Sequence, residues 1–112
     1  MRPLILAISL LALGTSCGPT CKSTCERLYG DTPDCAIERP GRTRTDLLDF
    51  CMTECTTATG IPGDVGDYDP YERLSSAEAA TLENRAQAEV WMDCVAETSC
   101  DRFSEGYCAP VW

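Results

Sequence analysis

Nine cysteines dominate the chemistry available to this 112-residue chain. Four of them form two pairs in which three residues separate the partners, Cys21 with Cys25 and Cys51 with Cys55. This spacing places both thiols of a pair on one face of a helix, one turn apart. Two such helices running antiparallel can be joined by disulfides from Cys21 to Cys55 and from Cys25 to Cys51. A zinc site is disfavoured, because the chain has no histidine and zinc-binding cysteines commonly lie closer together.

The remaining cysteines of the body are Cys35, Cys94, Cys100 and Cys108. If the third helix runs antiparallel to the second, Cys94 and Cys100 come near the loop that contains Cys35. We therefore expect two bridges within this set and favour Cys35 to Cys100 and Cys94 to Cys108. Two other pairings stay open, because spacing alone does not fix connectivity.

An export signal precedes the cysteine-rich part. Arg2 is followed by an apolar run from Leu4 to Leu13 and then by small residues up to Ser16. The run is too short for a membrane-spanning helix, which needs roughly 20 residues. The pattern predicts a signal peptide over residues 1–16, and an exported chain explains why its cysteines would form disulfides.

The end of this signal, Gly14-Thr15-Ser16-Cys17, resembles the lipobox of bacterial lipoproteins. That family usually has a large aliphatic residue at the place of Gly14. The resemblance implies a lipid on the Cys17 thiol and, through Gly18, transport to the outer membrane or cell surface. The odd number of cysteines agrees with a lipid on Cys17, since lipidation of one of nine leaves eight for four bridges. The alternative is an ordinary signal-peptidase cut and a secreted protein.

Cleavage would leave 17–112 as a single cysteine-rich domain of 96 residues. Its formal charge is −10, because removal of the positively charged Arg2 makes the −9 of the full sequence one unit more negative. This balance argues against nucleic acid and anionic headgroups as partners, since both attract cations. The membrane is expected as a partner through the lipid alone.

The fold class expected is mainly α, a disulfide-stapled helical hairpin with a third long helix and long loops. The first helix is short, with Pro19 at its first position and Gly30 as its stop. The second spans about residues 45–59, because Thr43 and Asp46 resemble a capping box and Gly60 with Pro62 ends the run.

A third helix is expected from a second capping box, Ser75 with Glu78, to about Thr98. At roughly 23 residues and 1.5 Å per residue it would be the longest element, about 34 Å. Its apolar stripe comprises Ala79, Leu82, Ala86, Val90, Trp91 and Cys94. Trp91 is therefore expected in the core, and the apolar tail from Gly106 to Trp112 is expected to dock on the body.

Two resemblances extend beyond the signal. Residues 21–55 are similar to the twin CX3C hairpins of plant hairpin peptides and small intermembrane-space chaperones, although the segment between Cys25 and Cys51 is longer here. The cysteine layout, Trp91-Met-Asp-Cys and the ending Gly-Tyr-Cys-Ala-Pro-Val-Trp resemble small cysteine-rich lipoproteins of uncharacterised function from myxobacteria. Neither resemblance implies an activity.

Candidate binding residues lie mainly in one loop. Asp64, Asp67, Asp69 and Glu72 offer oxygen ligands for calcium, although their spacing is not that of a helix-loop-helix calcium site. The alternative is a solvated acidic loop, or one that pairs with the basic cluster Arg39, Arg42 and Arg44. Tyr68 and Tyr71 are candidate anchors for a partner or side chains that lie back on the domain.

No catalytic residue and no cofactor is predicted. Histidine, the commonest general base at neutral pH, is absent from the sequence, and no serine or cysteine motif indicates an activated nucleophile. We expect a non-enzymatic, lipid-anchored interaction or structural module of the cell envelope. The alternatives are a secreted effector or inhibitor, or a thiol-redox or folding helper in which a pair such as Cys94 and Cys100 cycles, although the common Cys-x-x-Cys spacing is absent from the sequence.

Overall fold

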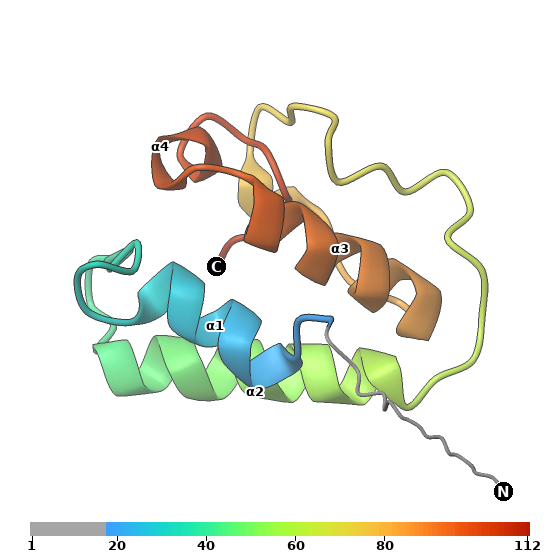
Figure 1. Ribbon diagram of the computed structural model, residues 1–112, viewed down its shortest axis with the longest axis horizontal. Coiled ribbons are helices and arrows are strands. Elements are labelled where there is room, and N and C mark those ends of the chain that lie inside the picture. The colour runs from blue at the N-terminus through green and yellow to red at the C-terminus, as the bar shows by residue number, and fades with distance from the viewer. Residues whose placement is uncertain (1–17) are drawn as a thin grey trace, which may run out of the picture.

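The computed structural model describes residues 18–112, so the expected signal peptide and Cys17 lie outside the described part. Helices α1 (Cys21–Tyr29) and α2 (Arg44–Thr59) form an antiparallel hairpin, and α3 (Arg85–Glu97) packs against both (Figure 1). A 3-10 turn, η1 (Ala77–Ala79), and a short helix, α4 (Cys100–Phe103), complete the described elements. The mainly α, disulfide-stapled architecture expected from the sequence is confirmed.

Helix α1 begins after Thr20 because a capping box satisfies its first amide groups. Ser23 N donates to Thr20 Oγ1 over 3.0 Å, and Thr20 N donates to Ser23 Oγ over 2.9 Å. Pro19 therefore lies before the cap and not at the first helical position, where we expected it. The helix ends at Gly30, as expected, and the Gly30 amide closes the last turn on Glu26 O.

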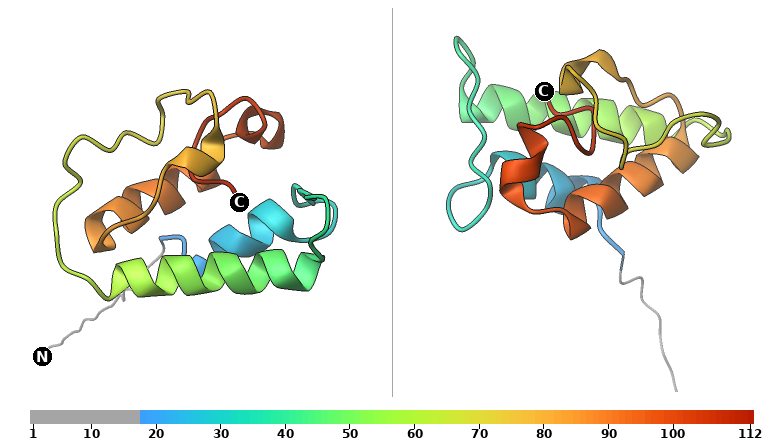
Figure 2. Two further views of the ribbon diagram at one scale, coloured as in Figure 1. Left: turned by 180° about the vertical axis from the view of Figure 1, so that it is seen from behind. Right: turned by 90° about the horizontal axis from the view of Figure 1, so that it is seen from above.

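Helix α2 is the longest element, with 16 residues. The expected capping box is confirmed, since Asp46 N donates to Thr43 Oγ1 over 3.0 Å and Thr43 N to Asp46 Oδ2 over 3.2 Å. Gly60 follows as the cap at its other end. The loop of residues 31–43 enters α2 at one end and the loop from residue 60 leaves at the other, so they lie at opposite ends of the hairpin (Figure 2).

Four disulfides connect these elements. Two link α1 to α2, with Cα atoms 5.7 and 5.9 Å apart. A third ties the loop after α1 to α4, and the fourth ties α3 to the C-terminal tail. The pairs are those favoured from the sequence, Cys21–Cys55, Cys25–Cys51, Cys35–Cys100 and Cys94–Cys108.

The third helix differs from the expectation, because it has 13 residues and begins after Asn84. The predicted capping box at Ser75 does not form; Ser76 precedes η1 without a side-chain cap, and Glu78 lies 3.7 Å from Arg39 Nε instead. Asn84 is a strong cap, and its Oδ1 accepts from Gln87 N over 3.0 Å. Residues 80–84 lie outside any helix, so the expected continuous 23-residue helix is wrong.

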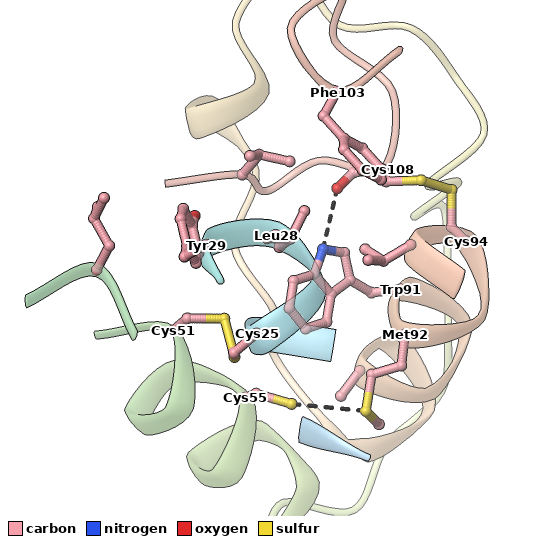
Figure 3. Close-up of a cluster of buried hydrophobic side chains, with 14 of the residues drawn as sticks. Cys25, Leu28, Tyr29, Cys51, Cys55, Trp91, Met92, Cys94, Phe103 and Cys108 are labelled. Atoms are coloured by element: carbon pink, nitrogen blue, oxygen red, sulfur yellow. Dashed lines mark hydrogen bonds between the residues drawn. A yellow bond between two sulfur atoms is a disulfide. The ribbon is translucent and has the colours of Figure 1, made fainter. Parts of the chain in front are cut away.

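The core lies between α1, α2 and α3. Trp91 is fully buried there, as expected, in a cluster that also includes Leu28, Tyr29, Leu47 and residues of the tail (Figure 3). The buried stripe of α3 also includes Ala88, Met92 and Val95, whereas Ala86 and Val90 are half-buried. Burying the Met92 and Val95 side chains contributes about 1.5–3 kcal/mol each.

The tail docks on this core, as expected. Trp91 Nε1 donates to Cys108 O over 3.0 Å and to Pro110 O over 2.9 Å, and Tyr29 Oη donates to Trp112 O over 2.7 Å. The tail also lies against Leu74, and only glycine at position 106 permits this close contact. A Cβ on Gly106 would lie 2.0 Å from Leu74 O, and the φ of Gly106 is +106°.

Candidate functional site

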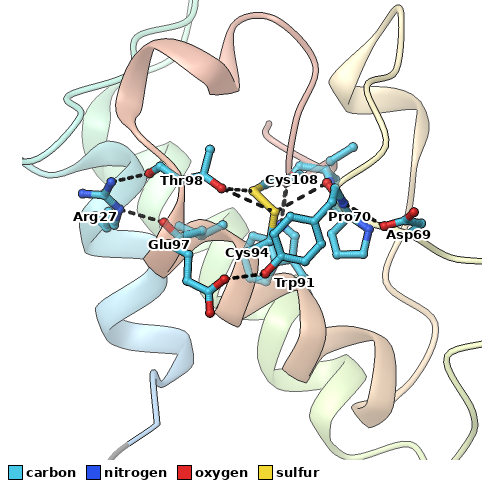
Figure 4. Close-up of a disulfide and its surroundings, with 12 residues drawn as sticks. Arg27, Asp69, Pro70, Trp91, Cys94, Glu97, Thr98 and Cys108 are labelled. Atoms are coloured by element: carbon cyan, nitrogen blue, oxygen red, sulfur yellow. Dashed lines mark hydrogen bonds between the residues drawn. A yellow bond between two sulfur atoms is a disulfide. The ribbon is translucent and has the colours of Figure 1, made fainter.

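The redox alternative named Cys94 and Cys100 as a pair, but these two cysteines are not bonded to each other. Cys94 is bonded to Cys108, and both sulfurs are fully buried beneath Pro70 and Thr98 (Figure 4). Thr98 Oγ1 lies 3.3 Å from Cys108 Sγ. Because a thiolate must reach a sulfur to exchange with it, burial protects this bridge.

The end of α3 next to this bridge is held by Arg27. Arg27 Nε donates to Val95 O over 2.8 Å, and its other nitrogen donates to Thr98 O. The guanidinium also lies over the Phe103 ring, 5.9 Å from its centroid. A cation at the carbonyl end of a helix is favourable, so Arg27 fastens α1 to α3.

The calcium hypothesis gains no geometric support. No three acidic, cysteine or histidine side chains within residues 18–112 gather closely enough to hold a metal ion. Asp69 Oδ1 instead accepts from Tyr71 N over 3.0 Å, and the backbone oxygen of Asp64 accepts from Asn84. The loop also does not pair with the basic cluster, whose carboxylate partners are Asp31 and Glu78.

The two candidate tyrosine anchors differ in their surroundings. Tyr68 lies back on the domain, where its hydroxyl donates to Ala109 O and burial raises its pKa above the ordinary value. Tyr71 is 49% exposed, and its hydroxyl donates to Glu97 Oε1 over 2.8 Å. This hydrogen bond to a carboxylate raises the pKa of Tyr71 to about 12.

Arginine and aromatic side chains gather on the surface at the end of the hairpin where α2 begins. The segment Arg39-Pro40-Gly41-Arg42 forms a tight turn in which Arg42 N donates to Arg39 O over 3.2 Å. Pro40 fixes the second position, and Gly41 takes the left-handed conformation, φ +76°, that such a turn requires at the third. The turn thereby holds Arg39 and Arg42 side by side.

Two hollows share these arginines. One, of about 280 Å³, is lined by Arg44 and Glu38 and lies over Ile37 and Leu47. The other, of about 430 Å³, is lined by aromatic rings and one carboxylate, with Pro40, Phe50, Trp112 and Glu78 around it. We call the arginine, proline and aromatic side chains that line these hollows the arginine–aromatic surface: Arg39, Pro40, Arg42, Arg44, Phe50 and Trp112.

The aromatic part of this surface rests on the core. The Phe50 ring meets Trp112 edge to face at 5.5 Å, and Trp112 meets buried Trp91 at 5.7 Å. Phe50 stays 39% exposed although it is a large apolar side chain. The rings therefore form an apolar floor that is partly open to solvent.

The three arginines differ in how far their charge is used within the molecule. Arg44 Nη1 is 2.7 Å from Asp31 Oδ1, and Arg39 Nε is 3.7 Å from Glu78 Oε2. Arg42 forms no ion pair with any residue of the described range; its guanidinium lies over the Phe50 ring at 5.1 Å. Arg42 therefore carries the charge most available to a ligand.

The surface lies away from the point where the chain enters the domain. Cys21, at the start of α1, is bonded to Cys55 near the end of α2, whereas Arg44 begins α2. At 1.5 Å per residue, Arg44 and Cys55 are about 16 Å apart along the helix. The loop of residues 31–43 projects on the side away from the start of the described chain (Figure 2).

Sequence reasoning identified the arginine cluster but missed its aromatic partners. Phe50 belongs to α2 and Trp112 to the tail, and the fold alone brings them together. The helical periodicity of α2 predicts which of its side chains are buried, the cysteines among them, and says nothing about the partners of the exposed Phe50.

Within the described residues, no helix combines the length and apolarity needed to cross a membrane. Comparisons with protein-family models, with curated proteins and with solved structures found no match to this chain.

Proposed function

We propose that this chain is a lipid-anchored, acidic protein of the cell envelope that acts as a non-enzymatic interaction module. The observation that carries the proposal is the cysteine arrangement. All eight cysteines of residues 18–112 are bonded to one another, and each bridge joins two different segments. Such a framework suits an oxidising compartment outside the cytosol.

The bridges also support a separate role for Cys17. A sulfur takes part in one disulfide at a time, so the four internal bridges leave the ninth cysteine of the sequence for a different bond. A thioether to a diacylglyceryl group uses it, and the preceding apolar segment provides the export signal. Two lipid chains give the stable membrane attachment that an acidic domain lacks by itself.

The geometry suits presentation of a binding face. With a lipid on Cys17, the chain of residues 18–20 spans at most about 10 Å, so the Cys21–Cys55 end of the hairpin would face the bilayer. The arginine–aromatic surface would then point away from the membrane. Exposed arginine and aromatic side chains are the types enriched at protein interfaces.

Replacement of Cys17 tests the anchoring. In a bacterial host, C17S should move the protein from the membrane fraction to the soluble fraction, while the four bridges still form. S16A keeps a small residue before the cysteine and serves as the control that should stay in the membrane fraction. Membrane attachment of C17S would exclude the lipoprotein proposal, and soluble wild-type protein would favour the secreted alternative.

A further inference from the structure

We infer that the arginine–aromatic surface binds an acidic peptide segment of a partner protein, one that carries an aromatic or large aliphatic side chain next to carboxylates. The inference rests on the proposed function and names the class of its partner. It is drawn from two hollows that meet at the same pair of arginines.

The polar hollow supplies the recognition of a carboxylate. Arg39, Arg42 and Arg44 line one space, and a single carboxylate, that of Glu38, lines it with them. Guanidinium groups bind carboxylates through paired hydrogen bonds, which fix the orientation of the anion. Arg39 and Arg44 already have carboxylate partners, but Arg42 makes no ion pair in the described part of the chain. A carboxylate that binds Arg42 therefore does not have to displace a competing one.

The apolar hollow supplies a site for the neighbouring side chain. Phe50 and Trp112 form its floor and Pro40 its edge, beside the same two guanidinium groups. A ring or branched aliphatic chain placed there would cover the exposed part of Phe50. A ligand that carries an anionic group next to an apolar group can therefore occupy the polar and the apolar hollow at the same time.

Charge explains why a short segment fits better than an extended polyanion. The whole sequence has a net charge of −9, and the positive patch consists of three arginines with Asp31, Glu38 and Glu78 beside it. Three more carboxylates, those of Asp46, Asp49 and Glu54, line a neighbouring hollow with Arg42 and Phe50, so the positive charge is confined to a small area. A nucleic acid or an anionic membrane would extend over acidic surface and be repelled. A short peptide with one or two carboxylates stays within about a Debye length, near 8–10 Å, of the arginines.

Selection from a displayed library of random linear peptides tests the inference. The full chain, purified with its disulfides formed, is used in parallel with R42E and with K22E, which makes the same charge change on exposed Lys22 of α1. Wild type and K22E should enrich peptides that place Asp or Glu beside an aromatic or large aliphatic residue. Measured by fluorescence anisotropy, R42E should bind those peptides at least tenfold more weakly, and F50A should lose the preference for the aromatic residue.

Several results would overturn the inference. They are enrichment of peptides without carboxylates, no common enriched sequence, or equal affinity of R42E and wild type. Arg42-dependent binding to phosphatidylglycerol vesicles would assign the surface to lipid. Self-association of wild type that R42E abolishes in sedimentation would assign it to a second copy of the chain. None of these readouts depends on Cys17, so a failure here is distinct from a failure of the anchoring proposal.

Discussion

Removing either bridge of the α1–α2 hairpin alone should cost less than half of the stability lost when both are removed. The reason lies in how the two bridges share one loop. Cys21–Cys55 closes a loop with a sequence separation of 34, and Cys25–Cys51 lies inside it with a separation of 26. In the chain-entropy description, closing the outer loop in the unfolded chain contributes about 3.8 kcal/mol at 25 °C.

The second bridge acts on a chain that is already closed. It divides the outer ring into a ring with a separation of 26 and a small ring made of the two short segments, Cys21 to Cys25 and Cys51 to Cys55, each with a separation of four. Its additional contribution is then about 2.2 kcal/mol, because its ends already belong to one ring. By the same reasoning, loss of the outer bridge alone costs about 2.5 kcal/mol, and loss of both costs about 6 kcal/mol. The double removal thus exceeds the two single removals together by about 1.3 kcal/mol.

Urea unfolding followed by circular dichroism, without reductant, measures these three losses. The variants are C25A/C51A, C21A/C55A and the quadruple change, each with the other two disulfides intact. The voids left by alanine at the buried cysteines occur in the single-bridge and the quadruple variants alike, so they largely cancel in the comparison. Additive losses, or single-bridge losses below about 0.5 kcal/mol, would refute the reasoning from nested loops.

Three further changes probe the contacts around the core. Replacing Arg27 by Met removes two hydrogen bonds to the end of α3 and should lower the free energy of unfolding by about 2–3 kcal/mol in urea titration, whereas a change at exposed Lys22 should leave it unaltered. Replacing Trp91 by Phe leaves two buried carbonyl groups without their donor and should cost about 2–4 kcal/mol by the same measurement. The protonated Tyr71 contributes stability that is present below pH about 10 and lost as the pH rises to about 12, and Glu97→Gln should lower the pKa of Tyr71 seen by phenolate absorbance.

Local signals predicted the hairpin well because its determinants lie close together in the sequence. Thr43 and Asp46 form a capping box within one turn, and the four-residue cysteine spacing fixes which side of each helix faces the other. These features need no knowledge of distant contacts.

The third helix shows where local signals lose to tertiary contacts. The sequence offers a capping box at Ser75, but the Glu78 carboxylate lies near Arg39, in a segment far away in the chain. Val111 N donates to Ala77 O over 3.3 Å, and Asn84 binds the loop at Asp64. These contacts keep the segment before α3 from joining the helix, and none of them is visible in a local pattern.

The arginine–aromatic surface has the same origin. Its arginines are neighbours in sequence and were recognised as a basic cluster. The aromatic rings come from positions 50 and 112, and the docked tail alone places them together. Surfaces of this kind depend on the packing of the whole chain, so residue spacing does not reveal them.

Intact-mass spectrometry of the protein isolated from a bacterial host, before and after reduction, tests the central claim most directly. We predict a chain that begins at Cys17 and carries a diacylglyceryl group on it, and that gains eight hydrogens on reduction, two for each of the four bridges. A mass without lipid would contradict the anchoring. A gain of fewer than eight hydrogens would contradict the fully bridged framework that holds the binding surface in place.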